Sequence, residues 1–310
     1  MPPLRVGYVP EHFSTPLHFA QTYFSLSADL IPFPSGTGHM VTALCAGELD
    51  IAIGLTEGWI AAIAKGPPSS QTTDAKPGEN EFKLVGTYVE TPLCWAISTG
   101  HEKEHITSVQ DLEGKKVGVS RIGSGSYVMS YVLADREGWD QPFECLPLQT
   151  FEALRKGVND GTVDFFMWEY FTSKRYYTPG TLHPIKKVGE IYTPWSSWKI
   201  VARTPLIDTP EVNSFLEKVN AGVKYFGEHK EEAVQYISTQ LDYTEEDAKE
   251  WMKTVRFAQN VKGVKESVVR DTIDMLQKAG VIEGEAWQEG SEVNKAKKFV
   301  GTVTKEHSNV

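Results

Sequence analysis

One short sequence pattern occurs twice in this chain and constrains the fold more than any other feature. Residues 43–53 read ALCAGELDIAI, and residues 160–168 read DGTVDFFMW after a helix-like segment that begins at Ala153. In both copies, a glycine suited to closing a helix precedes an aspartate and a short apolar run. Such a run is typical of a strand buried on both faces of a sheet. Two copies far apart in one chain predict two α/β lobes with a cleft between them.

The remainder of the chain alternates between strand-like and helix-like segments, and its periodicity becomes helical from residue 210 onward. We therefore expect an α/β fold with mainly parallel sheets and C-terminal helices. Residues 1–92 and 196–310 are expected to form the first lobe, and residues 93–195 the second, with a two-strand hinge. Residues 66–81 are rich in Pro, Ser, Thr and Gly and are expected to form a surface loop.

Composition argues against two classes of partner. The 310-residue chain carries a net charge of -10 and has no basic cluster, so we expect no binding to nucleic acid. No apolar run approaches the ~20 residues of a membrane span, so membrane insertion is not expected either. The first residues lack the basic and apolar regions of an export signal, and the 3 cysteines are widely spaced. The expected location is the cytoplasm, unless a signal has been removed.

Two glycine- and serine-rich turns, at residues 35–38 and 123–126, each lead into a helix-like segment. Ligands of open α/β sheets bind beyond the carboxyl ends of the strands, where both turns are expected to lie. Free N–H groups at a helix N-terminus favour a negatively charged or carbonyl oxygen. One such turn alone is better explained as a helix cap. For two turns at matching places in the two lobes, a helix cap and a binding site are equally well supported. Neither turn has the glycine spacing and lysine of a nucleotide-binding loop.

Glutamates and tryptophans lie near the same predicted strand ends. Glu57 and Glu169 follow the two repeated strands and can accept hydrogen bonds from an amine or hydroxyl group. Trp168 and Trp195 offer flat apolar faces suited to a planar or aliphatic ligand. The alternatives are solvated glutamates, and tryptophans that pack in the junction between the lobes.

Residues 101–105 read HEKEH and formally match a zinc-binding motif. That motif requires a buried helix with apolar flanks, whereas polar residues lie on both sides of this segment. No Cys-x-x-Cys pair, nucleophile elbow or compact His/Asp/Ser set is present. We therefore expect neither a metal site nor a catalytic residue.

Four segments resemble type II periplasmic-binding-protein-like domains: residues 4–10 (LRVGYVP), the turn at 34–38, residues 47–54 (GELDIAIG) and residues 111–119 (DLEGKKVGV). The most similar branch contains the aliphatic-sulfonate, nitrate and taurine binding proteins and the fungal thiamine-pyrimidine-precursor synthases. Residues 54–59 (GLTEGW) resemble intracellular orphan members found in fungi. The likeness extends over residues 4–202, with the helical C-terminal part completing the first lobe.

The resemblance implies two lobes that close on a ligand by hinge motion. The residues expected to contact the ligand are Pro10, Glu11, His12, Ser35, Gly36, Thr37, Gly38, Thr56, Glu57, Gly58, Gly123, Ser124, Gly125, Ser126, Trp168, Glu169 and Trp195.

This chain departs from the family in two ways, and these limit the functional properties that the resemblance implies for it. Transport members are exported and deliver their ligand to a membrane partner, but no export signal is seen here and no transporter partner is identified. The thiamine-precursor synthases have a cysteine-rich run and a pocket lysine that holds pyridoxal phosphate. This chain has no cysteine cluster, and none of the expected ligand-contacting segments contains a lysine. No cofactor is therefore expected.

The favoured hypothesis is a cytoplasmic, non-enzymatic protein that binds a small molecule. Its ligand would have an anionic or carbonyl end and a flat or apolar body, like a pyrimidine, a thiamine precursor or a sulfonate. The alternative is an enzyme related to thiamine pyrimidine precursor biosynthesis. A ligand-responsive sensor domain is a third possibility, weakened by the lack of an attached module.

Overall fold

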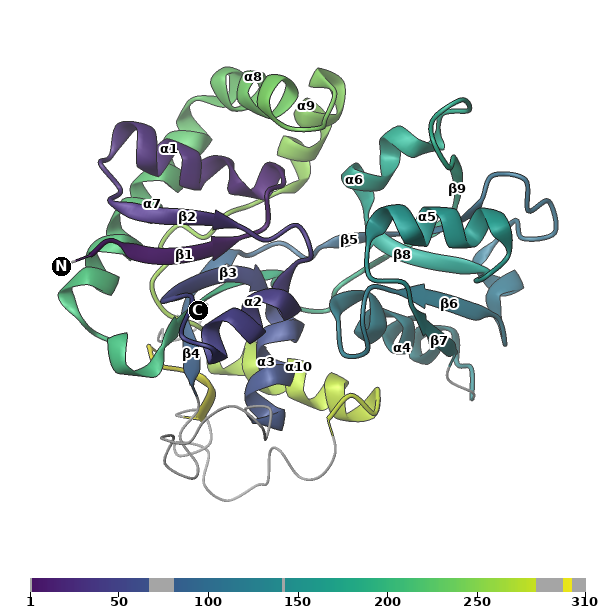
Figure 1. Cartoon of the computed structure of the whole chain (residues 1–310), viewed down its shortest axis with the longest axis horizontal. Coiled ribbons are helices and arrows are strands. Elements are labelled where there is room, and N and C mark those ends of the chain that lie inside the picture. Colours follow the sequence, from purple (N-terminus) through teal and green to yellow (C-terminus); the bar gives the residue numbers. More distant parts are fainter. Residues whose placement is uncertain (1, 67–80, 141–142, 283–297, 303–310) are drawn as a thin grey trace, which may run out of the picture. The chain divides into compact units, whose positions relative to one another are not determined.

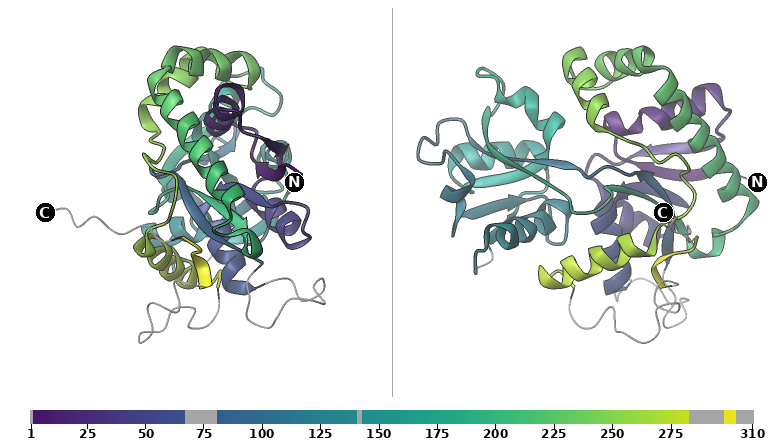
Figure 2. Two further views of the ribbon diagram at one scale, coloured as in Figure 1. Left: turned by 90° about the vertical axis from the view of Figure 1, so that its left-hand side faces the viewer. Right: turned by 180° about the vertical axis from the view of Figure 1, so that it is seen from behind.

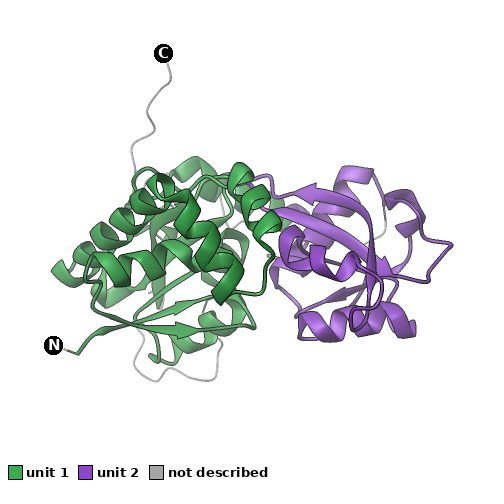
Figure 3. Cartoon of the chain, turned by 90° about the horizontal axis from the view of Figure 1, so that it is seen from above, with its two compact units in different colours: residues 1–91, 195–277, 282–310 green, residues 92–194, 278–281 purple. Residues whose placement is uncertain are grey.

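The computed structural model describes residues 2–66, 81–140, 143–282 and 298–302 (Figure 1). The chain forms two compact units (Figure 3). Unit 1 contains residues 1–91, 195–277 and 282–310, and unit 2 contains residues 92–194 and 278–281. The expected loop at 66–81 and the polar tail after residue 283 fall almost entirely outside the described residues.

Unit 1 contains a five-stranded sheet in the order β2-β1-β3-β10-β4. Its strands are β1 (Leu4–Tyr8), β2 (Ala28–Pro32), β3 (Ile51–Leu55), β4 (Phe82–Val89) and β10 (Trp198–Arg203). Its helices are η1 (His12–Ser14), α1 (Thr15–Tyr23), α2 (Thr37–Cys45), α3 (Thr56–Lys65), η4 (Thr204–Leu206), α7 (Pro210–Glu228), α8 (Lys230–Gln240), α9 (Glu245–Thr254) and α10 (Glu266–Lys278), whose last residue belongs to unit 2. Helices α1, α7, α8 and α9 lie on one side of the sheet, and α2 and α3 lie on the other (Figures 1 and 2).

Unit 2 contains a second five-stranded sheet, in the order β7-β6-β8-β5-β9. Its strands are β5 (Cys94–Gly100), β6 (Lys116–Val119), β7 (Glu144–Pro147), β8 (Phe165–Glu169) and β9 (Ile185–Tyr192). Its helices are η2 (Val109–Leu112), α4 (Gly125–Glu137), α5 (Phe151–Asp160), α6 (Tyr170–Lys174) and η3 (Arg175–Tyr177). Helices α5 and α6 lie on one side of this sheet and α4 on the other (Figures 1 and 2).

The two sheets have the same topology. In each, three parallel strands are followed by one antiparallel strand, β10 or β5, which pairs on its other edge with a fifth strand. Four of the five strands in each sheet therefore point the same way. The predicted α/β fold is confirmed, with sheets that are mixed because β10 and β5 run against their neighbours.

The repeated sequence pattern forms β3 and β8, which occupy the same place in the two sheets. Gly47 and Gly161 have φ values of 70° and 86°, the left-handed conformation that glycine adopts at the end of a helix. Three residues later, the Oδ2 atoms of Asp50 and Asp164 accept hydrogen bonds from the backbone N–H groups of Arg5 and Lys116, both at 3.0 Å. The repeated aspartate thus binds the adjacent parallel strand in both units.

Candidate functional site

The turn that precedes α2 is bound to the end of β3 in unit 1. Gly36 caps the helix with a φ of 75°. Thr37 is buried, and its Oγ1 atom accepts a hydrogen bond from the backbone N–H of Leu55 at 2.9 Å. A Cβ atom added to Gly58 would lie 2.8 Å from Cγ2 of Thr37, so this glycine permits a close approach of α3 to the turn. Three predicted residues of unit 1, Gly36, Thr37 and Gly58, therefore lie together; Ser35 is exposed and Gly38 is half-buried.

Glu57, in the first turn of α3, is completely buried. Its Oε2 atom accepts a hydrogen bond from Nε1 of Trp195 at 2.9 Å. Its Oε1 atom has no hydrogen-bond partner among the described residues. Burial raises the pKa of Glu57 to about 7, although hydrogen bonds to the carboxylate partly oppose the shift. The site therefore contains a carboxyl oxygen that is shielded from solvent and available to a hydrogen-bond donor.

The segment after Trp195 is also anchored to the start of α3. Oγ1 of Thr56 donates a hydrogen bond to the carbonyl oxygen of Ser196 at 2.5 Å, and the backbone N–H of Thr56 donates to the carbonyl oxygen of Ser197 at 3.0 Å. Three predicted residues, Thr56, Glu57 and Trp195, are thus brought together although they are far apart in the sequence.

Lys199 of β10 is a functional candidate that the sequence analysis did not include. It is completely buried, and its Nζ atom donates a hydrogen bond to Oγ of Ser196. Burial lowers the pKa of Lys199 to about 7, against the attraction of the Glu90 and Glu57 carboxylates. The available signal was a lysine within the otherwise apolar run of residues 198–202.

His12 is packed inside an aromatic cluster of unit 1. Its ring centroid lies 4.5 Å from those of Phe13 and Tyr243 and 4.2 Å from that of Trp251. Burial lowers the pKa of His12 well below its usual 6.5, so the imidazole is neutral at physiological pH. These ring contacts favour a packing role for His12, while Pro10 and Glu11 are half-buried next to it in sequence.

In unit 2 the predicted turn at residues 123–126 is held by its own hydroxyl groups. Gly123 has a φ of 81°. Oγ of Ser124 caps α4 by accepting from the backbone N–H of Tyr127 at 3.4 Å, and it lies 3.0 Å from Oγ of Ser126. Oγ of Ser126 accepts from the backbone N–H of Ser120 at 3.0 Å. The turn, which also includes the buried Gly125, joins the carboxyl end of β6 to the N-terminus of α4.

Trp168 and Glu169 lie at the end of β8 and have contacts within unit 2. Trp168 is half-buried and stacks on Phe151, with ring centroids 5.2 Å apart. Oε2 of Glu169 accepts from the backbone N–H of Thr172 at 2.7 Å and from its hydroxyl at 2.9 Å. Burial raises the pKa of Glu169 to about 7, and the Thr172 hydrogen bonds oppose the shift. Glu169 therefore caps α6, whereas Glu57 has an oxygen left for a ligand.

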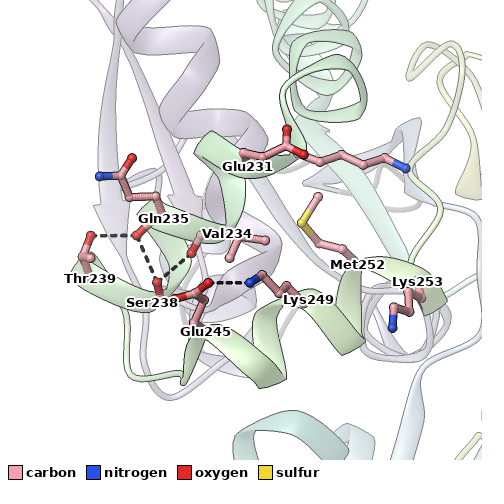
Figure 4. Close-up of a pocket in the computed structure, with 10 residues that line it drawn as sticks. Glu231, Val234, Gln235, Ser238, Thr239, Glu245, Lys249, Met252 and Lys253 are labelled. Carbon is pink, nitrogen blue, oxygen red and sulfur yellow. Dashed lines mark hydrogen bonds and ion pairs between the residues drawn. The ribbon is translucent and has the colours of Figure 1, made fainter.

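A groove of about 680 Å³ is lined by residues of α8 and α9 and of the segments that flank them (Figure 4). Val234 and Met252 supply apolar surface, and Lys249 is paired with Glu245. None of the predicted ligand-contacting residues lines this groove.

The described residues include no group of three side chains placed to hold a metal ion. No helix in the described part of the chain has the length and apolar character needed to cross a membrane.

Comparisons with known proteins identify the fold. A solved structure from Candida albicans has 40% sequence identity and a TM-score of 0.84, and the match covers 100% of this chain and 99% of that one. It is described as the CA3427 gene product, which defines a family with the generic periplasmic binding protein fold. No curated protein sequence matches this chain.

Two more distant structures share the fold alone. The alkanesulfonate-binding protein SsuA from Xanthomonas axonopodis pv. citri, bound to MOPS, has 16% identity and a TM-score of 0.70, over 92% of this chain and 95% of that one. The nitrate-binding protein NrtA from Synechocystis has 12% identity and a TM-score of 0.70, over 97% of this chain and 86% of that one. The model of the Ca3427-like periplasmic-binding-protein family matches residues 95–191. With the full-length 40% identity to the Candida albicans protein, this shows that the chain belongs to the Ca3427-like family of proteins with the periplasmic-binding-protein fold.

Proposed function

We propose that this protein reversibly binds a small molecule that donates a hydrogen bond to Glu57. The observation that carries this proposal is the Oε1 atom of Glu57, which is buried and has no partner among the described residues. A buried carboxyl oxygen without a partner is costly, and a ligand N–H or O–H group would remove that cost. Trp195 fixes the carboxyl group by its hydrogen bond to the other oxygen.

We infer the chemistry of the other parts of the proposed ligand from the turns that precede α2 and α4. The N-termini of α2 and α4 supply N–H groups for an anionic or carbonyl end, as in a sulfonate, a pyrimidine or a thiamine precursor. We propose that Trp168 contacts a flat or apolar body and that ligand binding closes the hinge. Small-angle X-ray scattering tests the closure, since the radius of gyration should fall when ligand is added.

A second candidate is an enzyme related to thiamine pyrimidine precursor biosynthesis. The observation that favours it is Lys199, which places an amine in the neighbourhood of Glu57. We also propose a cytoplasmic location, supported by the free state of Cys45, Cys94 and Cys145. Fluorescence microscopy of the tagged protein in its native cell tests the location.

Thermal-shift screening of sulfonates, nucleobases, pyrimidines and vitamin precursors tests the binding function, because a ligand of the folded state raises the melting temperature. Glu57→Gln is expected to weaken binding of any hit about tenfold or more, as for loss of a buried charged hydrogen bond. Glu217→Gln, at an exposed position of α7, is the matched control and should bind as the wild type does. Equal ligand affinity of the two variants would show that Glu57 does not contact the ligand.

A further inference from the structure

One face of α8 and one face of α9 line the groove of about 680 Å³ (Figure 4). The lining side chains recur four residues apart along each helix, within residues 230–239 of α8 and 245–253 of α9. Residues with this spacing lie on the same side of a helix. Both helices belong to unit 1, and the volume of the groove falls within the usual range of small-molecule sites, about 300–1,000 Å³. The groove is therefore large enough for a small ligand, and residues of one unit alone line it.

The hydrocarbon surface of the groove comes from Val234 of α8 and Met252 of α9. Met252 is half-buried, and its unbranched thioether side chain can adapt to an apolar guest. The hydroxyl groups of Ser238 and Thr239 donate hydrogen bonds to backbone carbonyl oxygens of α8 itself. Because these hydroxyl groups already have acceptors, this part of the groove offers a ligand mainly apolar contact.

Lys230 and Lys253 lie at the end of the groove that is remote from the connection between the helices. Lys230 is the first residue of α8, and Lys253 is the last but one of α9. The four-residue connection at 241–244 makes the two helices an antiparallel pair, which brings these ends together. Both lysines are exposed, and neither forms an ion pair among the described residues. Two ammonium groups at one end of the groove are thus available to an anion.

The other charged groups of the lining leave a positive balance. Lys249 forms an ion pair with Glu245 at 2.5 Å, and Glu231 is the second carboxylate of the lining. Three lysines and two glutamates give the lining a net charge of +1, on a chain whose net charge is -10. The groove therefore favours an anion over a cation, against the charge of the chain as a whole.

We propose that the groove binds a straight-chain carboxylate of medium length, with its anionic end at Lys230 and Lys253 and its hydrocarbon chain in the apolar part. Two ammonium groups can donate hydrogen bonds to one carboxylate, and the alkyl stems of both lysines extend the apolar surface. From residue 230 to residue 238, α8 rises about 12 Å, which leaves room for a longer chain than that of acetate or butyrate. This inference goes beyond the binding proposed at Glu57 and does not depend on it.

Methyl NMR of the intact chain tests the site directly. The chain is labelled with ¹³C at the methyl groups of its 6 methionines and titrated with sodium decanoate below the micellar concentration. The Met252 signal, assigned from Met252→Leu, is expected to shift and to saturate, because Met252 lines the groove. The signals of Met40, Met129 and Met167 should not move, because these side chains are completely buried in the core.

Related probes separate the apolar and the charged contributions to affinity. Each methylene group that the groove covers adds up to about fourfold, so hexanoate should bind at least about tenfold more weakly than decanoate. Decyltrimethylammonium has a similar chain and the opposite charge, and it should bind at least about fivefold more weakly than decanoate. Higher salt should weaken decanoate binding, since the lysines are exposed.

Substitutions of the lining charges should change the affinity in opposite directions. Lys230→Gln and Lys253→Gln are each expected to weaken decanoate binding about two- to fivefold, as for loss of an exposed ion pair. Glu231→Gln should strengthen binding by a similar factor, because it removes a carboxylate that repels the anion. Lys156→Gln, at an exposed position of α5 in unit 2, is the matched control and should bind decanoate as the wild type does.

Three results would overturn the proposal. They are a Met252 signal that does not respond to decanoate, equal responses to decanoate and decyltrimethylammonium, and shifts of the core methionines that reveal unfolding by the probe. A Met252 shift that follows protein concentration instead of decanoate would also overturn it and would make the groove an interface between two copies. Lys253→Gln should retain the thermal shift of any ligand bound at Glu57, so the two proposals fail or succeed separately.

Discussion

Nε1 of Trp195 lies 2.9 Å from Oε2 of Glu57 and is oriented as its hydrogen-bond donor. Trp195 is the first residue of unit 1 after the chain returns from unit 2, and Glu57 belongs to the first turn of α3. The bond therefore connects the returning segment to the end of β3. It also engages the Oε2 atom of Glu57, while the Oε1 atom remains available to a hydrogen-bond donor of a ligand.

Replacement of Trp195 by Phe removes this donor and leaves a buried carboxyl oxygen unpaired. We expect a loss of about 1–3 kcal/mol in the free energy of unfolding beyond the effect of lost ring volume, and a further rise in the pKa of Glu57. Trp198→Phe is the matched control, because Trp198 is also buried and its Nε1 atom has no partner among the described residues. Urea unfolding at neutral pH compares the two variants. An equal loss of unfolding free energy in both would show that the Trp195 hydrogen bond does not stabilise the folded chain.

The buried glutamates make stability depend on pH. Burial raises the pKa of Glu57 from its ordinary 4.5 to about 7 in the folded chain. Between these values the folded state holds one more proton than the unfolded state, so the free energy of unfolding falls as the pH rises. Over the full window, 2.5 pKa units correspond to about 3 kcal/mol. Glu57→Gln should remove this contribution and be more stable than the wild type above pH about 7.

Glu169→Gln is expected to behave in the same way, since burial also raises the pKa of Glu169 to about 7. Urea unfolding at several pH values between about 4.5 and about 8 measures both slopes. A wild-type stability that stays flat over this window, or a slope that neither substitution reduces, contradicts the assigned pKa values.

The elements that sequence analysis predicted best are those encoded within a few consecutive residues. The glycine and apolar run of each repeat suffice to predict a helix end and a buried strand, so β3 and β8 were recognised. A local contact of this kind also begins α9, where the hydroxyl of Thr244 caps the helix by accepting from the backbone N–H of Asp247 at 3.0 Å. Local chemistry alone determines these features.

The features that sequence analysis missed depend on residues far apart in the chain. Lys199 is buried because β10 lies between β3 and β4, and this strand order joins segments that are far apart in the sequence. The packing of the His12 ring against Tyr243 and Trp251 likewise joins residues that are far apart in the sequence. The mixed character of each sheet has the same origin, since no local pattern sets the direction of β10.

The packing of α1 against α7 depends on a glycine that sequence analysis did not single out. A Cβ atom at Gly222 would lie 2.2 Å from the carbonyl oxygen of Pro16 and 2.9 Å from the backbone nitrogen of Ala20. Gly222→Ala must therefore push the helices apart, with an expected loss of about 2–4 kcal/mol. Gly227→Ala, in the same helix and with open space around it, should be neutral or stabilising by up to about 1 kcal/mol. Thermal unfolding compares the two variants, and equal melting temperatures would contradict the close approach of α1 to α7 at Gly222.

The repeated aspartates allow the same experiment in each unit. Asp50 and Asp164 each accept a backbone N–H from the adjacent parallel strand, and both have a pKa below the usual 3.8 because hydrogen bonds to cationic and backbone donors outweigh burial. Asp50→Asn and Asp164→Asn are each expected to cost about 1–3 kcal/mol at neutral pH. For a lowered pKa, the stabilisation is present above pH about 3.8 and is lost as the pH falls through the folded value, so the difference from the wild type should shrink in acid.

The two aspartates lie in different units and share no hydrogen-bond partner among the described residues, so their effects should be independent. In the double variant the two losses should add to within about 0.5 kcal/mol. Calorimetry of the four proteins forms the double-mutant cycle, and a coupling above about 1 kcal/mol would show that the two repeats do not stabilise their units separately.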